Sequence, residues 1–312
     1  MSECRPIQGV IPVVQTPFTA DGDIDEGALV KELAWIKSQQ VAGYATGMVS
    51  DLLRLEGDER RQLSEIVVDA ARTWGLLSVI SAGAESTKTA IGRARHAEEL
   101  GADAIMLNPP VTVTLDDAGL RQYFCNVIDS VRIPVVVQDA SGYVGRSIPI
   151  ALQTELLDRF GDQVYFKPEA QPIGPRLTLL REATDGRARV FEGSGGIALI
   201  DSYQRGIVGT MPGSEVCWAI QAMWDALCDG NVDRAYTISG PLSCMLSMQT
   251  AIDVYVAVEK HLLQRQGVID STATRGPSGF TLDPESTAEI DRLFDRLTMA
   301  VGGIGASVAA GQ

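Results

Sequence analysis

The stretch Pro134-Val135-Val136-Val137-Gln138 is a short apolar run that lies between two segments with helical periodicity, Asp116–Val131 and Pro149–Phe160. A run of this length, bounded by turn residues, is typical of a parallel strand that is buried on both faces. The same unit recurs along the chain. Seven further runs, separated by helix-sized segments, are Val10–Gln15, Gly43–Met48, Leu77–Ser81, Ala104–Leu107, Val164–Lys167, Arg189–Glu192 and Ile207–Met211.

Eight such strand–helix units predict an α/β protein whose sheet closes into a (β/α)8 TIM barrel. An open, doubly wound sheet is the alternative, but no GxGxxG motif follows the first strand to support it. After residue 214 the pattern becomes helical only. We therefore expect a barrel catalytic domain over residues 1–214, a C-terminal helical appendage over residues 215–300 and a flexible tail over residues 301–312.

The composition argues against several classes of partner. The 312 residues carry a formal net charge of -14, which disfavours nucleic acid and anionic membranes because phosphate binding needs clustered Lys and Arg. We see no signal peptide at the N-terminus and no apolar stretch of bilayer length, so we expect a cytoplasmic protein. The five cysteines lack CxxC spacing, so free thiols are expected and a metal site is not.

Active sites of TIM barrels lie at the C-terminal ends of the strands, and Lys167 is the distinctive residue at those ends. It closes the apolar run Val-Tyr-Phe-Lys, and Pro168 after it favours an extended backbone. An uncharged amine is a nucleophile toward carbonyl groups. A structural lysine, paired with Glu169 or another carboxylate, is the alternative. The other lysines fall within helical segments, where solvent is the expected environment: Lys31, Lys37, Lys88 and Lys260.

The loop after the seventh predicted strand is rich in glycine, with the sequence Gly193-Ser194-Gly195-Gly196. Barrels often bind phosphate with the loops after strands seven and eight, through backbone N–H groups. The loop could therefore serve a phosphorylated sugar, or it could simply form a tight turn between strand and helix.

Several of these strand ends also resemble one family. The opening Gly9-Val-Ile-Pro-Val-Val-Gln-Thr-Pro-Phe18, the segment Gly101-Ala-Asp-Ala104, Lys167 and Gly193 match the dihydrodipicolinate synthase / N-acetylneuraminate lyase family. The resemblance implies a class I Schiff-base lyase that forms a covalent imine between Lys167 and pyruvate or a small 2-keto acid. It also implies that no metal or organic cofactor is needed, and that the protein is a homo-oligomer, either a dimer or a tetramer.

The departures from the family pattern are informative. The usual Tyr-Asn-x-Pro of the fifth strand is Gln138-Asp139-Ala140-Ser141 here, and an amide cannot replace the proton-relaying tyrosine as an acid or base. Tyr143, followed by Val144, stands where dihydrodipicolinate synthases carry an arginine. Met48 replaces a glutamate, and Pro109-Pro110-Val111 replaces a tyrosine pair of the family's dimer contact. These losses argue against lysine biosynthesis.

The chain instead resembles the family's Gln-Asp branch, which includes L-2-keto-3-deoxyarabonate dehydratase. Ser50-Asp51 and Lys167-Pro168-Glu169 match that branch. The resemblance favours a dehydratase over an aldolase, with Lys167 as the electrophilic catalyst and a water held by Gln138 or Ser50 that carries the proton. The substrate-binding residues expected from it are Thr46, Gly47, Ser50, Pro109, Glu169, Gly193, Ser194 and Met211.

Other interpretations of these residues stay open. Gln138 could be satisfied by the backbone, Thr46 could cap the following turn, and Glu169 could be a structural partner within the barrel. At the level of function, the alternatives are an aldolase like dihydrodipicolinate synthase or N-acetylneuraminate lyase, a non-catalytic 2-keto-acid-binding protein, and a phosphosugar enzyme.

Overall fold

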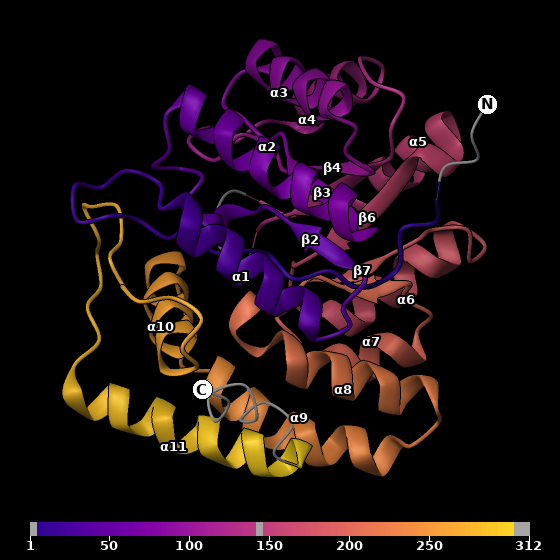
Figure 1. The fold of residues 1–312 in the computed structure, drawn as a ribbon. Helices are drawn as coiled ribbons and strands as arrows, with labels where there is room; N and C mark the ends of the chain where they lie inside the picture. Colours follow the sequence, from indigo (N-terminus) through magenta and orange to yellow (C-terminus); the bar gives the residue numbers. More distant parts are fainter. Residues whose placement is uncertain (1–4, 142–145, 303–312) are drawn as a thin grey trace.

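The computed structural model describes residues 5–141 and 146–302, and within them eight parallel strands form a (β/α)8 barrel (Figure 1). This confirms the predicted fold. The strands are β1 (Gly9–Val10), β2 (Gly43–Ala45), β3 (Leu77–Ser81), β4 (Ala104–Leu107), β5 (Val135–Asp139), β6 (Val164–Pro168), β7 (Phe191–Glu192) and β8 (Gly209–Thr210).

The barrel consists of two continuous sheets that are joined at two seams. The larger sheet has the order β2-β3-β4-β5-β6, and the smaller has the order β1-β8-β7. Single parallel bridges close the ring, one from Val13 to Ala45 and one from Phe166 to Val190. The chain therefore forms a complete ring, although the ladder is interrupted where the two sheets meet.

The first and last strands are shorter than the apolar runs that predicted them. The run Val10–Gln15 contributes only Gly9–Val10 to a regular strand, and Ile207–Met211 contributes only Gly209–Thr210. Prolines follow both strands, Pro12 and Pro212, and a proline has no N–H to donate to a neighbouring strand. The apolar side chains are buried as expected, but the regular ladder ends early.

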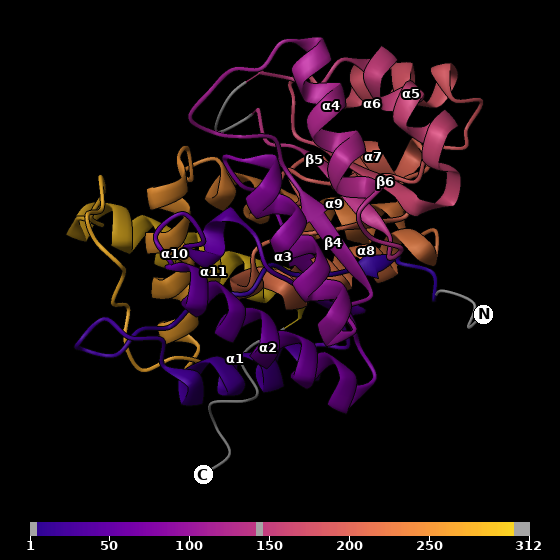
Figure 2. The same cartoon turned by 90° about the horizontal axis from the view of Figure 1, so that it is seen from above.

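The helices follow the predicted order around the outside of the barrel (Figure 2). They are α1 (Glu26–Ser38), α2 (Gly57–Trp74), α3 (Thr87–Leu100), α4 (Asp117–Ile128), α5 (Ile150–Phe160), α6 (Ile173–Ala183) and α7 (Leu199–Gln204). Side-chain caps fix several of their starts: the Asp25 carboxylate accepts from the Ala28 N–H, and the Ser86 hydroxyl oxygen accepts from the Thr89 N–H.

Alternation along the strands decides which side chains enter the barrel. Within β6, Tyr165 belongs to the small apolar cluster inside the ring, together with Val136 of β5. Val164 and Phe166 instead pack into the larger layer between strands and helices. The next inward position after Tyr165 is Lys167, so the strand directs the lysine toward the interior at its C-terminal end.

Helix α8 (Cys217–Cys228) follows β8 and contacts β1, so it completes the ring of barrel helices. Three more helices follow it within the described residues: α9 (Val232–Leu246), α10 (Ile252–Arg265) and α11 (Pro284–Val301). Helix α11 packs on α8 and α9 (Figure 1). Helix α10 contacts two short 3-10 turns, η1 (Met48–Ser50) after β2 and η3 (Ser214–Val216) after β8. It therefore lies against the face of the barrel where the strands end.

This arrangement confirms the expected C-terminal helical appendage. The division at residues 214 and 215 into two domains stays a prediction, and residues 303–312 of the predicted tail lie outside the described residues. Within the described ranges, none of the helices is both long and apolar enough to span a bilayer.

Candidate active site

Three polar side chains meet where β5 and β6 end. The Lys167 ammonium donates to Glu169 Oε1 over 2.6 Å, and the Gln138 side-chain amide donates to the same oxygen over 2.7 Å. The side chains of Lys167 and Glu169 are only 6% and 4% exposed. The structure thus brings together the two residues that the sequence assigned to catalysis, with Glu169 as the contact between them.

The strand register explains why these residues meet. Gln138 and Lys167 are direct partners in the β5–β6 ladder, so their side chains leave the sheet next to one another. The Glu169 N–H continues the ladder by donating to the Asp139 carbonyl. Gly193, at the end of β7, leaves the necessary room, because a Cβ there would lie 2.8 Å from Glu169 Cγ.

Burial sets the electrostatics of this group. It raises the pKa of Glu169, and the charge and hydrogen bond of Lys167 lower that pKa in the opposite direction. Glu169 Oε2 is buried and accepts no hydrogen bond from the described residues. One carboxylate oxygen is therefore held by the lysine and the amide, and the other is available to a ligand.

A cavity of about 50 Å³ opens beside this group. Of the predicted site residues, Gly47, Gly193 and Met211 line it together with Lys167, Gln138 and Glu169. The remaining wall comes from Val13, Met48, Val49, Met106, Gly195, Pro212, Gly213, Ile252, Tyr255 and Glu259.

Four other predicted binding residues do not line this cavity. Thr46 Oγ1 accepts from the Ser81 N–H, and the Ser50 hydroxyl donates to the Val14 carbonyl, so both hydroxyls tie neighbouring strand ends together. Pro109 is buried, and its carbonyl accepts from the Asn108 side chain. Ser194 contacts Glu192. Their roles in binding stay predictions.

In the glycine-rich loop Gly193–Gly196, Ser194 is engaged by protein contacts. Glu192 Oε1 accepts from the Ser194 N–H over 2.6 Å, and Ser194 Oγ accepts from the Ala198 N–H over 2.9 Å. A carboxylate thus takes one of the N–H groups that a phosphate would use. The loop forms the turn between β7 and α7, and phosphate binding by its remaining N–H groups stays a prediction.

Asp139 and the following segment also have structural contacts. The Asp139 carboxylate accepts from the N–H groups of Ile148 and Ser141, and it lies 3.8 Å from the Arg176 guanidinium. It therefore ties Ser141 and Ile148 to the end of β5. Tyr143 and Val144 lie outside the described residues.

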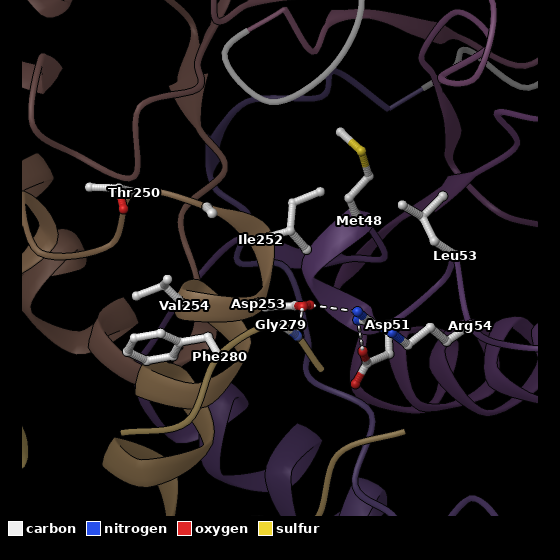
Figure 3. Close-up of a pocket in the computed structure, with 11 residues that line it drawn as sticks. Met48, Asp51, Leu53, Arg54, Thr250, Ile252, Asp253, Val254, Gly279 and Phe280 are labelled. Atoms are coloured by element: carbon white, nitrogen blue, oxygen red, sulfur yellow. Dashed lines mark hydrogen bonds and ion pairs between the residues drawn. The ribbon is translucent and has the colours of Figure 1, made fainter. Parts of the chain in front are cut away.

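A second, larger cavity has a volume of about 610 Å³, and Figure 3 shows the residues that line it. Met48 and Ile252 belong to both walls. In the larger cavity, Arg54 is paired with Asp253 at 2.6 Å and with Asp51 at 3.4 Å. The small cavity at Lys167 is thus bordered by an outer chamber whose walls are mostly apolar, with one neutralised arginine.

The chain is similar to a known protein family over nearly its whole length. The model of the dihydrodipicolinate synthetase family matches residues 6–295, which is nearly the whole chain. The chain belongs to that family. Members of the family are lyases, so the chain is an enzyme of this class. The strand-end motifs that suggested the resemblance are therefore confirmed at the level of the family, while the Gln-Asp branch stays a prediction.

Individual members of the dihydrodipicolinate synthetase family are distant from this chain. L-2-keto-3-deoxyarabonate dehydratase of Azospirillum brasilense is 26% identical over 93% of this chain and 94% of its own length. 4-hydroxy-tetrahydrodipicolinate synthase of Methanococcoides burtonii is 26% identical, over 62% of this chain and 65% of that protein. A prophage protein of E. coli K12, solved in complex with pyruvate, has a TM-score of 0.84 at 23% identity and covers 94% of this chain and 99% of its own.

The environments of two residues of α10 were not predicted from the sequence. Lys260, expected in solvent, is fully buried, so that expectation is wrong. Its ammonium donates to the carbonyls of Thr16 and Ala273 and lies 3.4 Å from Asp51. Glu259, next to it, enters the wall of the Lys167 cavity. Glu259 and Lys260 follow the buried apolar residues Val256 and Val258. This pattern indicates the buried face of the helix, but it does not indicate which part of the protein that face contacts.

Proposed function

We propose that this enzyme is a Schiff-base lyase of the family's Gln-Asp branch, acting on pyruvate or a 2-keto-3-deoxy acid, with dehydration favoured over aldol cleavage. The observation that carries the proposal is the buried Lys167 at the end of β6, paired with a single carboxylate at 2.6 Å and facing a cavity. An amine in this position can attack a keto group that enters the cavity.

Imine formation can start from the ion pair of Lys167 and Glu169. Lys167 passes a proton to Glu169, and the resulting amine attacks C2 of the keto acid to form the N–C bond. The carbonyl oxygen then leaves as water, taking one proton from the nitrogen and one from Glu169. The products are a protonated imine and a Glu169 carboxylate, so no cofactor takes part in the step.

The carboxylate is then placed to continue the reaction. The protonated imine withdraws electrons from the C2–C3 bond and acidifies the C3 hydrogens, and Glu169 is the nearest base to Lys167 Nζ. Gln138 restrains Glu169 Oε1 by its hydrogen bond, which leaves Oε2 to accept the proton. Gln138 thus acts by holding the base, in addition to the water-holding role expected from the sequence.

The relatives support both branches of this chemistry to different extents. The dehydratase of Azospirillum brasilense aligns with nearly the full chain, and the prophage protein of the same fold was solved with pyruvate. The Methanococcoides burtonii synthase supports carbon–carbon bond chemistry as the second candidate. The two candidates share the imine and differ in the fate of the substrate beyond C3.

The cavities suggest how a longer acid would lie. The small cavity at Lys167 matches the keto-acid end, and the rest of the molecule would pass Met48 and Ile252 toward the outer chamber. Assembly into a homo-oligomer stays a prediction from the resemblance.

Borohydride trapping tests the proposal. The enzyme would be incubated with pyruvate and, separately, with 2-keto-3-deoxy-pentonates and -hexonates, then reduced, digested and examined by peptide mass spectrometry. We expect an adduct on Lys167 with pyruvate, and an adduct with the mass of a dehydrated acid for the correct substrate. Absence of any adduct at Lys167 would refute the proposal, whereas only pyruvate-sized adducts from a longer acid would favour aldol cleavage.

Replacement of Glu169 gives a first mutational prediction. Glu169→Gln keeps the shape of the side chain but can neither accept nor return a proton, so we expect turnover to fall by about 10²- to 10⁴-fold. Steady-state kinetics would measure the change. Glu192→Gln is the matched control, because Glu192 is also buried at a strand end but does not line the cavity. Equal losses in the two variants would contradict the role given to Glu169.

A further inference from the structure

Three glutamates are buried together at the junction of the barrel and α10. Glu32 of α1, Glu215 of η3 and Glu259 of α10 are each no more than 2% exposed. The Gln15 N–H and the Ser214 hydroxyl both donate to Glu32, and the Gln15 side-chain amide donates to Glu259. Of the three, Glu259 lines the Lys167 cavity.

Glu215 and Glu259 form a close carboxyl pair. A Cβ built on Gly213 would lie 2.3 Å from Glu215 Oε2 and 2.6 Å from Glu259 Oε1, so these two oxygens are at most 4.9 Å apart. Glu215 Oε2 is buried and has no hydrogen-bond partner among the described residues. Two buried carboxylates at this separation repel one another strongly, and a proton on one of them relieves the repulsion.

Neighbouring charges do not neutralise the pair. Lys260 is a buried cation that interacts with Glu259, but its ammonium is engaged by Asp51 and by two backbone carbonyls. Neither Glu215 nor Glu259 has a salt bridge within the described residues. The described part of the chain also contains no group of three His, Cys, Asp or Glu side chains placed to hold a metal ion.

The ionisation of the cluster agrees with this geometry. Burial raises the pKa of Glu32 and of Glu215 to about 7 and raises the pKa of Glu259 well above its usual value, and Glu215 is the largest charge acting on Glu259. Several titratable and charged groups surround Glu259, some on its own helix and some on other elements. They are Glu32, Asp51, Tyr255, Lys260, Lys167, Glu169 and Glu215.

We infer that Glu259, which lines the same cavity as Lys167, is the acid that protonates the leaving hydroxyl of the substrate. The inference rests on the proposed Schiff-base function. Glu169 removes a C3 proton and an enamine forms. The enamine electrons then form the C3–C4 double bond, and the nitrogen becomes a protonated imine again. The C4–O bond breaks at the same time, and the hydroxyl leaves as water with the proton of Glu259.

The protonation state of Glu259 would decide between dehydration and aldol cleavage. Cleavage of the C3–C4 bond needs a base for the C4 hydroxyl, whereas elimination of water needs an acid at the same oxygen. Glu215 acts through Glu259 as a positioning residue, since its negative charge keeps the proton on Glu259. The carboxyl pair therefore favours elimination.

The test compares wild type with Glu259→Gln, Glu215→Gln and Tyr255→Phe. Each would be assayed for dehydration of 2-keto-3-deoxy-pentonates and -hexonates across pH, for borohydride trapping of pyruvate at Lys167, and for exchange of the pyruvate C3 hydrogens in D₂O by NMR. Trapping and exchange report the imine and its deprotonation, and neither requires an acid at C4.

We expect Glu259→Gln to lose dehydration by about 10²-fold or more, while trapping and exchange stay within about threefold of wild type. Dehydration by wild type should fall as pH rises through the raised pKa of Glu259. Glu215→Gln should move that fall to lower pH, because a like charge has been removed from Glu259.

Five outcomes would overturn the inference. Dehydration retained by Glu259→Gln would do so, and so would loss of trapping together with turnover in that variant, which would indicate a structural role. A loss confined to Tyr255→Phe would assign the acid to the tyrosine. Wild type that traps pyruvate but dehydrates none of these acids would overturn this inference and the preference for dehydration, but not the Schiff-base chemistry. Wild type that forms no adduct would overturn the Schiff-base chemistry as well.

Discussion

Lys167→Ala is expected to abolish the borohydride-stable adduct and to reduce turnover by at least about 10³-fold, since removing a nucleophile from an enzyme that depends on it costs several orders of magnitude. The side chain is buried at the end of β6 and is the amine that faces Glu169 in the cavity. The measurement is peptide mass spectrometry of the trapped protein, together with steady-state kinetics on the same preparation.

Two further variants make this result specific. Lys167→Arg keeps a positive charge beside Glu169, but a guanidinium stays protonated and forms no imine, so it should be equally inactive. Lys88→Ala removes an exposed lysine of α3 and should trap pyruvate as wild type does. An adduct that persists in Lys167→Ala would show that another amine carries the chemistry.

Lys260→Met is expected to lower the free energy of unfolding by about 3–5 kcal/mol, because it removes one partner of a buried ion pair. The ammonium is fully buried, lies 3.4 Å from Asp51 and donates to the carbonyls of Thr16 and Ala273. It also lies 4.4 Å from the centre of the Phe18 ring. Methionine fills the space but leaves these oxygens without a donor.

Chemical denaturation monitored by circular dichroism would measure the effect. The control is Lys31→Met, since Lys31 is half exposed and its partner Asp270 is almost fully exposed, and such pairs contribute about 0–1 kcal/mol. A Lys260→Met protein within about 1 kcal/mol of wild type would show that the buried lysine is not what joins α10 to the barrel.

The sequence was sufficient for the barrel and for the lysine side of the site. Alternation of apolar runs with helical segments predicts the eight strands, because parallel strands in a barrel are buried on both faces. The same logic predicts that Gln138, Lys167 and Glu169 gather, since they close two neighbouring strands. These contacts are local to adjacent units, so the order of the chain is enough to place them.

The glutamate side of the site depends on contacts that no local pattern encodes. Gln15 and Glu259 are hydrogen-bonded across a sequence separation of 244 residues, and Glu215 meets Glu259 only because α10 lies across the strand ends. Helical periodicity shows that Glu259 and Lys260 share a face with apolar residues, but it does not say that this face closes over the barrel. Their burial follows from tertiary packing.

The seam between β6 and β7 is expected to open more readily than the five-stranded sheet beside it. A seam held by one bridge, such as Phe166 with Val190, has few backbone hydrogen bonds, so its amides should exchange with solvent sooner than those within the five-stranded sheet. Lys167 lies beside this seam on the larger sheet, while Gly213 and Met211 follow the smaller one. A ligand that is covalently bound to Lys167 and rests against those residues would link the two sheets and slow exchange across the seam.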